Sequence, residues 1–282
     1  MAEITAAAVA KLREMTNAGM MDCKKALTEA KGDMGRAVDI LRKKGAATAV
    51  LKGGREAREG LIAQHIAPDG RLGVLVEVNC QTDFAARNET FKSFAEEVAR
   101  RLAAGPNAAF EAERVALVAK IGENVQVPRH VRMEVTGNGM VAAYIHTGAK
   151  VGVLVEVGAG KESTVGQDRF KQLVKDITLQ IAAGNPSVIS RDQASPAVIA
   201  KEREIAAQSD RLKGKPPQAI GKIIDGMLEK FYQAYCLLDQ GFVKRNSEVS
   251  VKEHIASVAG QLSDEITIRR FARFQVGEVP AA

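Results

Sequence analysis

Hydrophobic residues recur at helical spacing through residues 1–45 and predict three short helices around one small core. Thr5 and Asp33 are expected to cap the first and third helices, because their side chains can accept hydrogen bonds from free backbone N–H groups. The first helix is expected to break at 17–19, and the third to stop at 43–45. The inward faces are expected to carry Val9, Leu12 and Met15, then Met20, Cys23 and Leu27, then Ala37, Val38 and Leu41.

An internal repeat organises the middle of the chain. After a shift of 79 positions, residues 60–105 align without a gap on residues 139–184, and both copies contain the sequence GVLVEV. Each copy predicts two strands joined by a turn and followed by an amphipathic helix. In the first copy the valines alternate with Leu75 and Glu77, so one face of that strand is expected to be wetter than the other.

The chain after the second copy is largely helical. Two helices are expected at about 195–212 and 216–238, and the short reversal between them is typical of an antiparallel hairpin. The last strand is expected to have one basic face and one partly aromatic face. The remaining elements are expected at 111–121 (helix), 125–135 (strand), 251–262 (helix) and 266–276 (strand).

These patterns define the fold class as α+β. We expect an N-terminal three-helix domain, a core of two homologous antiparallel α/β subdomains, and an inserted antiparallel helical hairpin. The expected boundaries are a helical docking domain at 1–45, a basic linker, helical in part, at 46–60, core subdomain N at 61–138, core subdomain C at 139–190 and 240–282, and the hairpin at 191–239.

Charge suggests a macromolecular partner but leaves its kind open. The net charge is +6, and residues 1–58 hold twelve Lys and Arg against seven Asp and Glu. No aromatic residue precedes Phe84, so exposed bases would find no stacking platform there. A solvated or protein-facing basic surface is therefore favoured over an RNA site, and an RNA- or ribosome-binding protein is the main alternative.

Motifs of covalent chemistry are absent from the sequence. It contains no GxxxxGK[ST] phosphate loop, no GxGxxG after a strand, no GxSxG and no HExxH. Four histidines and three cysteines are scattered without metal-ligand spacing. We therefore expect no enzyme, no cofactor and no metal site. The first ten residues lack the basic start of a signal peptide, and no run of about 18 apolar residues occurs, so a cytoplasmic protein is expected.

The loop after GVLVEV differs between the two copies. The first copy reads NCQTDF and the second GAGKES, although the flanking scaffold is shared. One interpretation is structural: Asp83 caps the next helix and Phe84 packs on its first turn. The other is functional: Phe84 is an exposed wedge for the pocket of a partner.

Two long motifs resemble a known family. Residues 12–27, LREMTNAGMMDCKKAL, resemble the N-terminal signature of bacterial elongation factor Ts, and residues 77–85, EVNCQTDFA, resemble its Thr-Asp-Phe loop. Their order and separation also fit, and the resemblance covers essentially residues 1–278. It implies a ubiquitin-associated-like helical domain, two related core subdomains and a helical hairpin.

The resemblance also implies a function and the residues that perform it. Members are guanine-nucleotide exchange factors that release GDP from elongation factor Tu. The sequence leaves open whether this chain forms a one-to-one complex with Tu or a dimer of such heterodimers. The N-terminal domain would dock on the GTPase domain, the Thr-Asp-Phe loop would disturb the magnesium and switch region, and the second subdomain would grip the third domain of Tu. The residues implied for these contacts are Leu12, Arg13, Met20 and Met21, then Thr82, Asp83 and Phe84, then His146 and Gly148.

Three features depart from the family pattern. Ala85 follows the Thr-Asp-Phe loop where the family usually has valine, which is expected to soften local packing. Some members continue beyond the last strand with a helix that contacts Tu, whereas this sequence stops at 279–282, so a smaller interface is expected. The stretch 232–242 departs from the family pattern, so the far contacts of the hairpin are expected to differ from those of other members.

Overall fold

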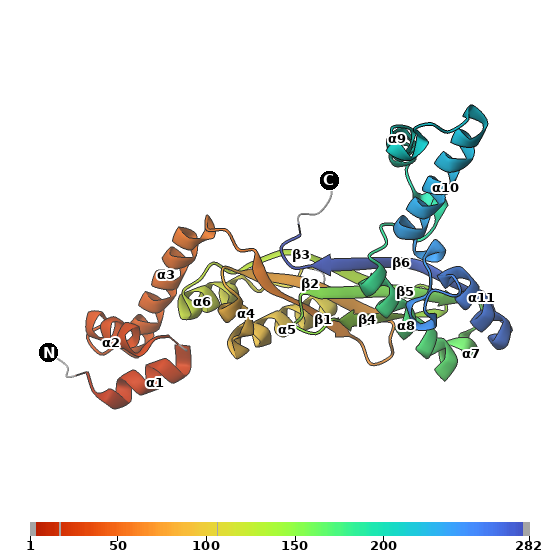
Figure 1. Cartoon of the computed structure of the whole chain (residues 1–282). Helices are drawn as coiled ribbons and strands as arrows, with labels where there is room; N and C mark the ends of the chain where they lie inside the picture. The colour runs from red at the N-terminus through yellow and green to blue at the C-terminus, as the bar shows by residue number, and fades with distance from the viewer. Residues whose placement is uncertain (1–3, 17, 106, 279–282) are drawn as a thin grey trace.

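The protein is α+β and is built around two three-stranded antiparallel sheets. The computed structural model describes residues 4–16, 18–105 and 107–278. In Figure 1 the N-terminal helices lie at one end and the two sheets form the middle. Helices α9 (Pro196–Ala207) and α10 (Pro217–Tyr235) project near the other end (Figure 1). Asn17, in the expected break at 17–19, and the chain end 279–282 lie outside the described residues.

Three helices form a small N-terminal core. They are α1 (Ala6–Thr16), α2 (Met20–Glu29) and α3 (Met34–Gly53). Both expected caps are confirmed: Thr5 accepts from the backbone N–H of Ala8 at 3.2 Å, and Asp33 from that of Arg36 at 2.9 Å. The buried residues are Val9, Leu12, Cys23, Ala26, Leu27, Ala30 and Ala37.

Helix α3 does not stop at 43–45, contrary to the sequence expectation, and the first half of the expected linker is helical. Gly45 lies in mid-helix, where α3 packs on α6 (Glu111–Ile121). A Cβ at Gly45 would lie 3.5 Å from the Cβ of Ala119 and 3.6 Å from a methyl of Val115. This glycine therefore marks a close helix–helix contact, whose packing offsets the low helix propensity of glycine.

The repeat supplies the central strand of each sheet. The first sheet has the order β1-β2-β3 and the second β4-β5-β6, with antiparallel pairing throughout. Both GVLVEV segments lie in the central strands. The strands are β1 (Glu59–Ile66), β2 (Leu72–Cys80), β3 (Gln126–Glu134), β4 (Gly139–Ile145), β5 (Val151–Ala159) and β6 (Ile266–Gln275).

One long helix covers the outer face of each sheet. Helix α5 (Glu89–Ala104) packs on the first sheet and α8 (Asp168–Gly184) on the second. Phe91 and Phe170, which are equivalent in the repeat, are fully buried in these contacts. The other helices around the sheets are α4 (Asp83–Arg87), α7 (Glu162–Val165) and α11 (Val251–Leu262).

The expectation of a wetter face on the GVLVEV strand is wrong, because β2 is buried on both faces. Its inner side packs against the second sheet through a cluster that contains Leu75 and Leu154. The two sheets approach closely at Gly73 and Gly152, where an added Cβ would lie 2.5 Å from Val141 and Ile62 respectively. The glycine that begins each GVLVEV thus leaves room for the contact between the two sheets.

The glutamate of each GVLVEV is buried and paired with arginine. Glu77 accepts from Arg129 at 2.6 Å and from the backbone N–H of Gly277 at 2.9 Å. Glu156 accepts from Arg269 at 3.0 Å and from Arg270 at 2.7 Å. Two adjacent arginines reach one carboxylate because the register of β6 shifts opposite Glu156.

The last strand therefore does not divide into one basic and one aromatic face. Phe271 packs into the core of the second sheet and its helix, whereas Phe274 packs into the cluster between the two sheets. Arg129 from the first sheet lies over the Phe274 ring, 4.4 Å from its centroid. Strand β6 thereby ties the two sheets together.

The helical hairpin is shorter than its sequence suggested. Helix α9 (Pro196–Ala207) and helix α10 (Pro217–Tyr235) pack on each other, and single 3-10 turns at 210–212 and 237–239 replace their expected last turns. Arg191 anchors the base through Glu229 at 2.7 Å. None of the helices in the described part of the chain is long and apolar enough to span a membrane.

We expect His254 to make stability fall as the pH is lowered. Its ring stacks on Phe242 with centroids 4.0 Å apart, and burial lowers its pKa, with Asp176 opposing and Lys244 and Arg245 adding to the shift. Below the ordinary value of 6.5 the unfolded chain takes up a proton that the folded chain resists. Thermal unfolding between about pH 8 and 5.5 should therefore show a larger fall for wild type than for His254→Phe. Equal falls would contradict this.

Candidate functional site

The most exposed aromatic side chain lies on the loop where the repeats diverge. Strand β2 ends at Cys80, and Phe84 follows in the first turn of the short helix α4. Phe84 is 81% exposed, whereas its neighbours Ala85 and Ala86 are buried against the core. A large apolar ring held in water at a fixed position is typical of an anchor for a protein partner.

Thr82, not Asp83, caps this helix. The Thr82 hydroxyl accepts from the backbone N–H of Ala85 at 3.2 Å, while Asp83 forms an ion pair with Arg87 at 3.0 Å. The structural interpretation of Asp83 as the cap and Phe84 as a packed staple is therefore wrong. The reason is local: α4 begins at Asp83, which leaves the preceding threonine as the residue whose side chain reaches the free N–H groups.

Glu123 is a residue of the site that the sequence analysis missed. It follows helix α6 and accepts hydrogen bonds from Gln81 and Thr82, 41 or more positions earlier in the chain. No local pattern marks a contact at such a separation. The loop that carries Phe84 is therefore held from its base by a carboxylate of another segment.

Cys80 is a structural thiol at the start of the loop. Burial, with the nearby charge of Glu123 adding to it, raises the pKa of Cys80 to about 12. The thiol lies 3.1 Å from the carbonyl oxygen of Thr82 and donates to it. It therefore stays protonated at neutral pH and is not a nucleophile.

A cleft of about 830 Å³ brings two of the expected contact regions together. It is lined by Asp83 and Arg87 of α4 on one side and by Gly148 and Lys150 around the β4–β5 turn on the other. Gly148 has φ +86°, which favours glycine at this turn. His146 lies at the same turn, exposed, with Nδ1 3.0 Å from the Tyr144 hydroxyl.

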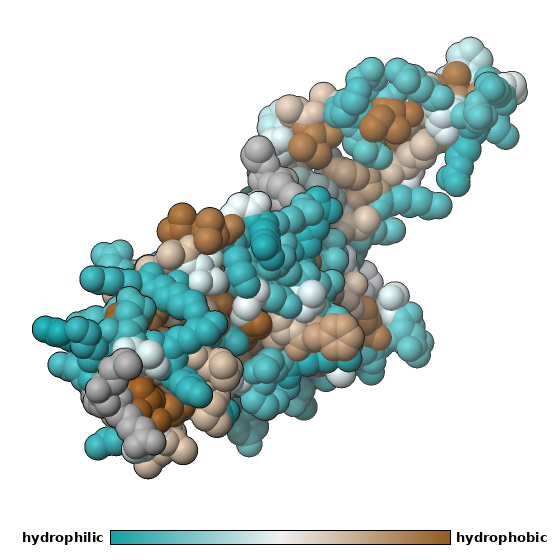
Figure 2. All heavy atoms as spheres, turned by 90° about the vertical axis from the view of Figure 1, so that its left-hand side faces the viewer, coloured by the Kyte–Doolittle hydropathy of each residue, from teal (hydrophilic) through white to brown (hydrophobic). Residues whose placement is uncertain are grey.

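A second apolar surface lies on the N-terminal helices, away from this cleft. Met20 and Met21, which form what we call the methionine surface, are 51% and 64% exposed. Arg13 on α1 is also exposed. Leu12 is fully buried, so it supports this surface from inside and the expectation that it contacts a partner is corrected. Met15, expected to face inward, is exposed instead. Figure 2 views this end and shows apolar patches among polar side chains.

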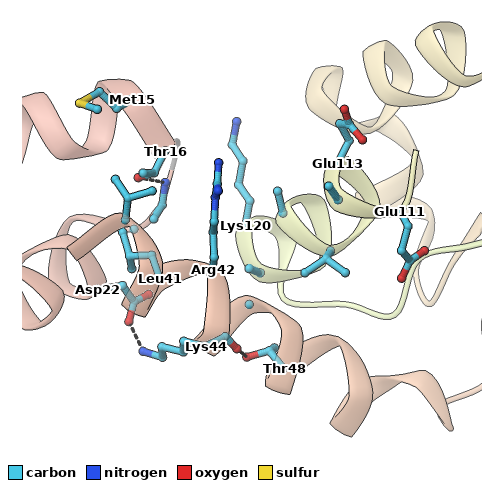
Figure 3. Close-up of a pocket in the computed structure, with 18 residues that line it drawn as sticks. Met15, Thr16, Asp22, Leu41, Arg42, Lys44, Thr48, Glu111, Glu113 and Lys120 are labelled. Carbon is cyan, nitrogen blue, oxygen red and sulfur yellow. Dashed lines mark hydrogen bonds and ion pairs between the residues drawn. The ribbon is translucent and has the colours of Figure 1, made fainter. Parts of the chain in front are cut away.

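A groove of about 790 Å³ is lined by residues of the N-terminal helices on one side and of α6 on the other. Figure 3 shows Arg42 of α3 and Lys120 of α6 extending in the same direction. Met15 of α1 lies on the side of the groove away from α6 (Figure 3). Glu111 and Glu113 on the α6 wall both pair with arginines, at 2.6 and 2.8 Å. The groove adjoins the methionine surface but does not reach the Phe84 loop.

The features of the site favour contacts with another protein. Among residues 4–16, 18–105 and 107–278, no group of three or more His, Cys, Asp or Glu side chains could hold a metal ion. The features that stand out are an exposed aromatic on a held loop, an exposed methionine surface and a cleft between two subdomain edges. Such features are typical of a protein that acts through contacts with another protein.

Comparisons with known proteins give the family. The model of the family Elongation factor TS matches residues 81–278. The chain is 40% identical to Elongation factor Ts of Nitratidesulfovibrio vulgaris (strain DP4) over 99% of this chain and 98% of the relative. It is 44% identical to that of Symbiobacterium thermophilum, over 99% and 93%, and 42% identical to that of Clostridioides difficile (strain 630), over 99% and 94%. The chain belongs to the elongation factor Ts family of translation factors.

Proposed function

We propose that this protein is a guanine-nucleotide exchange factor for elongation factor Tu, which promotes GDP release in the cytoplasm during translation elongation. Membership of the elongation factor Ts family supports this function. The observation that carries the mechanism is Phe84, exposed over most of its surface on a loop held at its base. The protein acts by binding and needs no cofactor of its own.

In the proposed complex three regions contact the GTPase. Arg13, Met20 and Met21 dock on the GTPase domain, with Leu12 behind them. Thr82, Asp83 and Phe84 enter the magnesium and phosphate region. His146 and Gly148 contact the third domain of Tu. The shared cleft of Asp83 and Gly148 supports simultaneous contact by one partner at the last two regions.

Release of GDP follows from differential binding. Phosphate-loop N–H groups and magnesium hold the nucleotide in a GTPase. A factor that binds the empty GTPase better than the loaded one must weaken nucleotide binding by the same ratio. A thousandfold weakening corresponds to about 4 kcal/mol. Insertion of Phe84 shifts a switch element of the partner and thereby disturbs the magnesium ligands.

The direct test is the release of a fluorescent GDP analogue from purified elongation factor Tu. Catalytic amounts of this protein, well below the concentration of Tu, should accelerate release by about two orders of magnitude or more. Spontaneous and stimulated release at the same rate would refute the exchange function. Steeply salt-dependent binding to ribosomal RNA in the same preparation would then favour the RNA-binding alternative.

Replacing Met20 and Met21 together by serine is expected to raise the concentration of this protein needed for half-maximal exchange by about tenfold or more. The reason is the loss of apolar area that docking buries. The maximal rate should change little, since Phe84 is untouched. Val50→Ser with Leu51→Ser is the matched control, because these side chains are 80% and 82% exposed on α3. Equal effects of both double variants would contradict a specific docking surface.

A further inference from the structure

The segment Gly122-Glu123-Asn124, directly after helix α6, connects two parts of the molecule that bear the proposed contacts. Toward the N-terminal helices, Lys52 of α3 donates to the carbonyl of Gly122. The side-chain amide of Asn124 donates to the carbonyl of Arg55 at 2.7 Å, just beyond the end of α3. The end of the long helix is therefore fixed to this segment at two points.

Toward the Phe84 loop, Glu123 makes three hydrogen bonds. One carboxylate oxygen accepts from the backbone N–H groups of Gln81 and Thr82, each at 3.0 Å. The other accepts from the Thr82 hydroxyl at 2.6 Å. Gln81 in turn accepts from the backbone N–H of Asn124 at 3.0 Å. Hydrogen bonds to an ionised carboxylate are stronger than those between neutral groups, so this contact restricts the loop.

The hydroxyl of Thr82 links Glu123 to the helix that carries Phe84. A hydroxyl has a single proton to donate. Since Thr82 donates it to Glu123, lone pairs of the same oxygen remain to accept from the backbone N–H of Ala85 and cap α4. Glu123 therefore sets the orientation of the cap, and through it the direction in which the first turn of α4 presents its side chains.

We propose that Glu123 is a positioning residue for nucleotide exchange, which holds Phe84 in the direction required for entry into the partner. It also fixes Phe84 relative to the N-terminal helices, because the same segment grips the end of α3. When the methionine surface binds the partner, Phe84 is therefore held at one fixed position relative to that contact. This inference rests on the proposed function, and Glu123 itself does not need to touch the GTPase.

The hold on the loop can be measured without the partner. The chain contains no tryptophan, so Phe84→Trp introduces a single indole reporter at the tip. Time-resolved fluorescence anisotropy should show an amplitude of nanosecond local motion at least about twice as large when Glu123→Ala is added. Glu111→Ala is the matched control, because it removes a Glu–Arg pair on α6 that does not touch the loop. Unchanged indole motion in the Glu123→Ala background would overturn the inference.

The kinetic consequence separates positioning from docking. Glu123→Ala should lower the maximal rate of GDP release about tenfold, which equals about 1.4 kcal/mol, while the half-saturating concentration stays within about threefold. Glu123→Gln keeps one acceptor oxygen, so its maximal rate of GDP release should lie between those of wild type and Glu123→Ala. It serves as the test if the alanine variant does not fold. A loss confined to the half-saturating concentration, or no loss, would overturn the inference. If wild type itself failed to release GDP, the proposed function would fall, while the anisotropy result would still decide whether Glu123 holds the loop.

Discussion

Replacing Phe84 by alanine is expected to lower the maximal rate of GDP release about thirtyfold or more, since a central aromatic anchor contributes about 2 kcal/mol or more. The ring is 81% exposed in the free protein and therefore buries little apolar surface there. In the proposed complex the ring is expected to be buried between side chains of the partner, so its loss should weaken the complex and leave the free protein unchanged. Stopped-flow release of a fluorescent GDP analogue at saturating concentrations of the variant measures the effect.

The same exposure supplies the control for Phe84→Ala. Because little of the ring is buried, its removal should change the thermal unfolding temperature by no more than about 1–2 °C. Phe84→Leu should keep part of the activity, because an aliphatic side chain still fills volume in a pocket. Full activity of the alanine variant would refute the wedge and leave exchange to the methionine surface and the β4–β5 turn.

Replacing Glu77 by alanine is expected to lower the free energy of unfolding by about 3–5 kcal/mol. Glu77 is almost fully buried, and its loss would leave the guanidinium of Arg129 in a low-dielectric environment without a carboxylate. It would also free the N–H of Gly277, which follows the strand that ties the two sheets together. Urea unfolding followed by circular dichroism measures the change.

Glu134→Ala is the matched control for Glu77→Ala. Glu134 pairs with Arg132 on the neighbouring part of β3 at 2.8 Å, but its side chain is exposed. Its removal should therefore cost less than about 1 kcal/mol. A cost for Glu77→Ala no larger than that of Glu134→Ala would show that the buried pair does not hold the sheets together.

The architecture could be predicted from the sequence where local signals and the repeat agree. The helix expected at 111–121 and the one expected at 251–262 have the observed bounds, and the strand expected at 266–276 ends one residue early. Errors arose where tertiary contacts override local signals. Gly45 reads as a stop, yet packing against α6 keeps it helical. Glu77 reads as solvated, yet Arg129 from another strand neutralises it in the interior.

The candidate site could be predicted only in part. The divergence of the two loops pointed to Phe84, and the structure shows that side chain exposed. Burial, in contrast, is a property of the assembled helices: Leu12 is buried, as its spacing predicted, although the resemblance implied a contact with the partner, whereas Met15 is exposed against the prediction. Glu123 could not be found, because a carboxylate that accepts from a loop 41 residues earlier has no periodic signature. The exposed residues proposed to contact the partner could thus be predicted more readily than the residues that hold them in place.

The central claim is that this protein binds the empty form of elongation factor Tu far better than the GDP-bound form. Titration calorimetry of wild type against both forms, at the same magnesium and salt concentrations, measures the two dissociation constants directly. Their ratio should be about a thousand, and GDP should bind the complex more weakly than free Tu by the same factor, because coupling between sites is reciprocal. Equal affinities for the two forms would contradict the account, because such a protein could not shift the nucleotide equilibrium however tightly it bound.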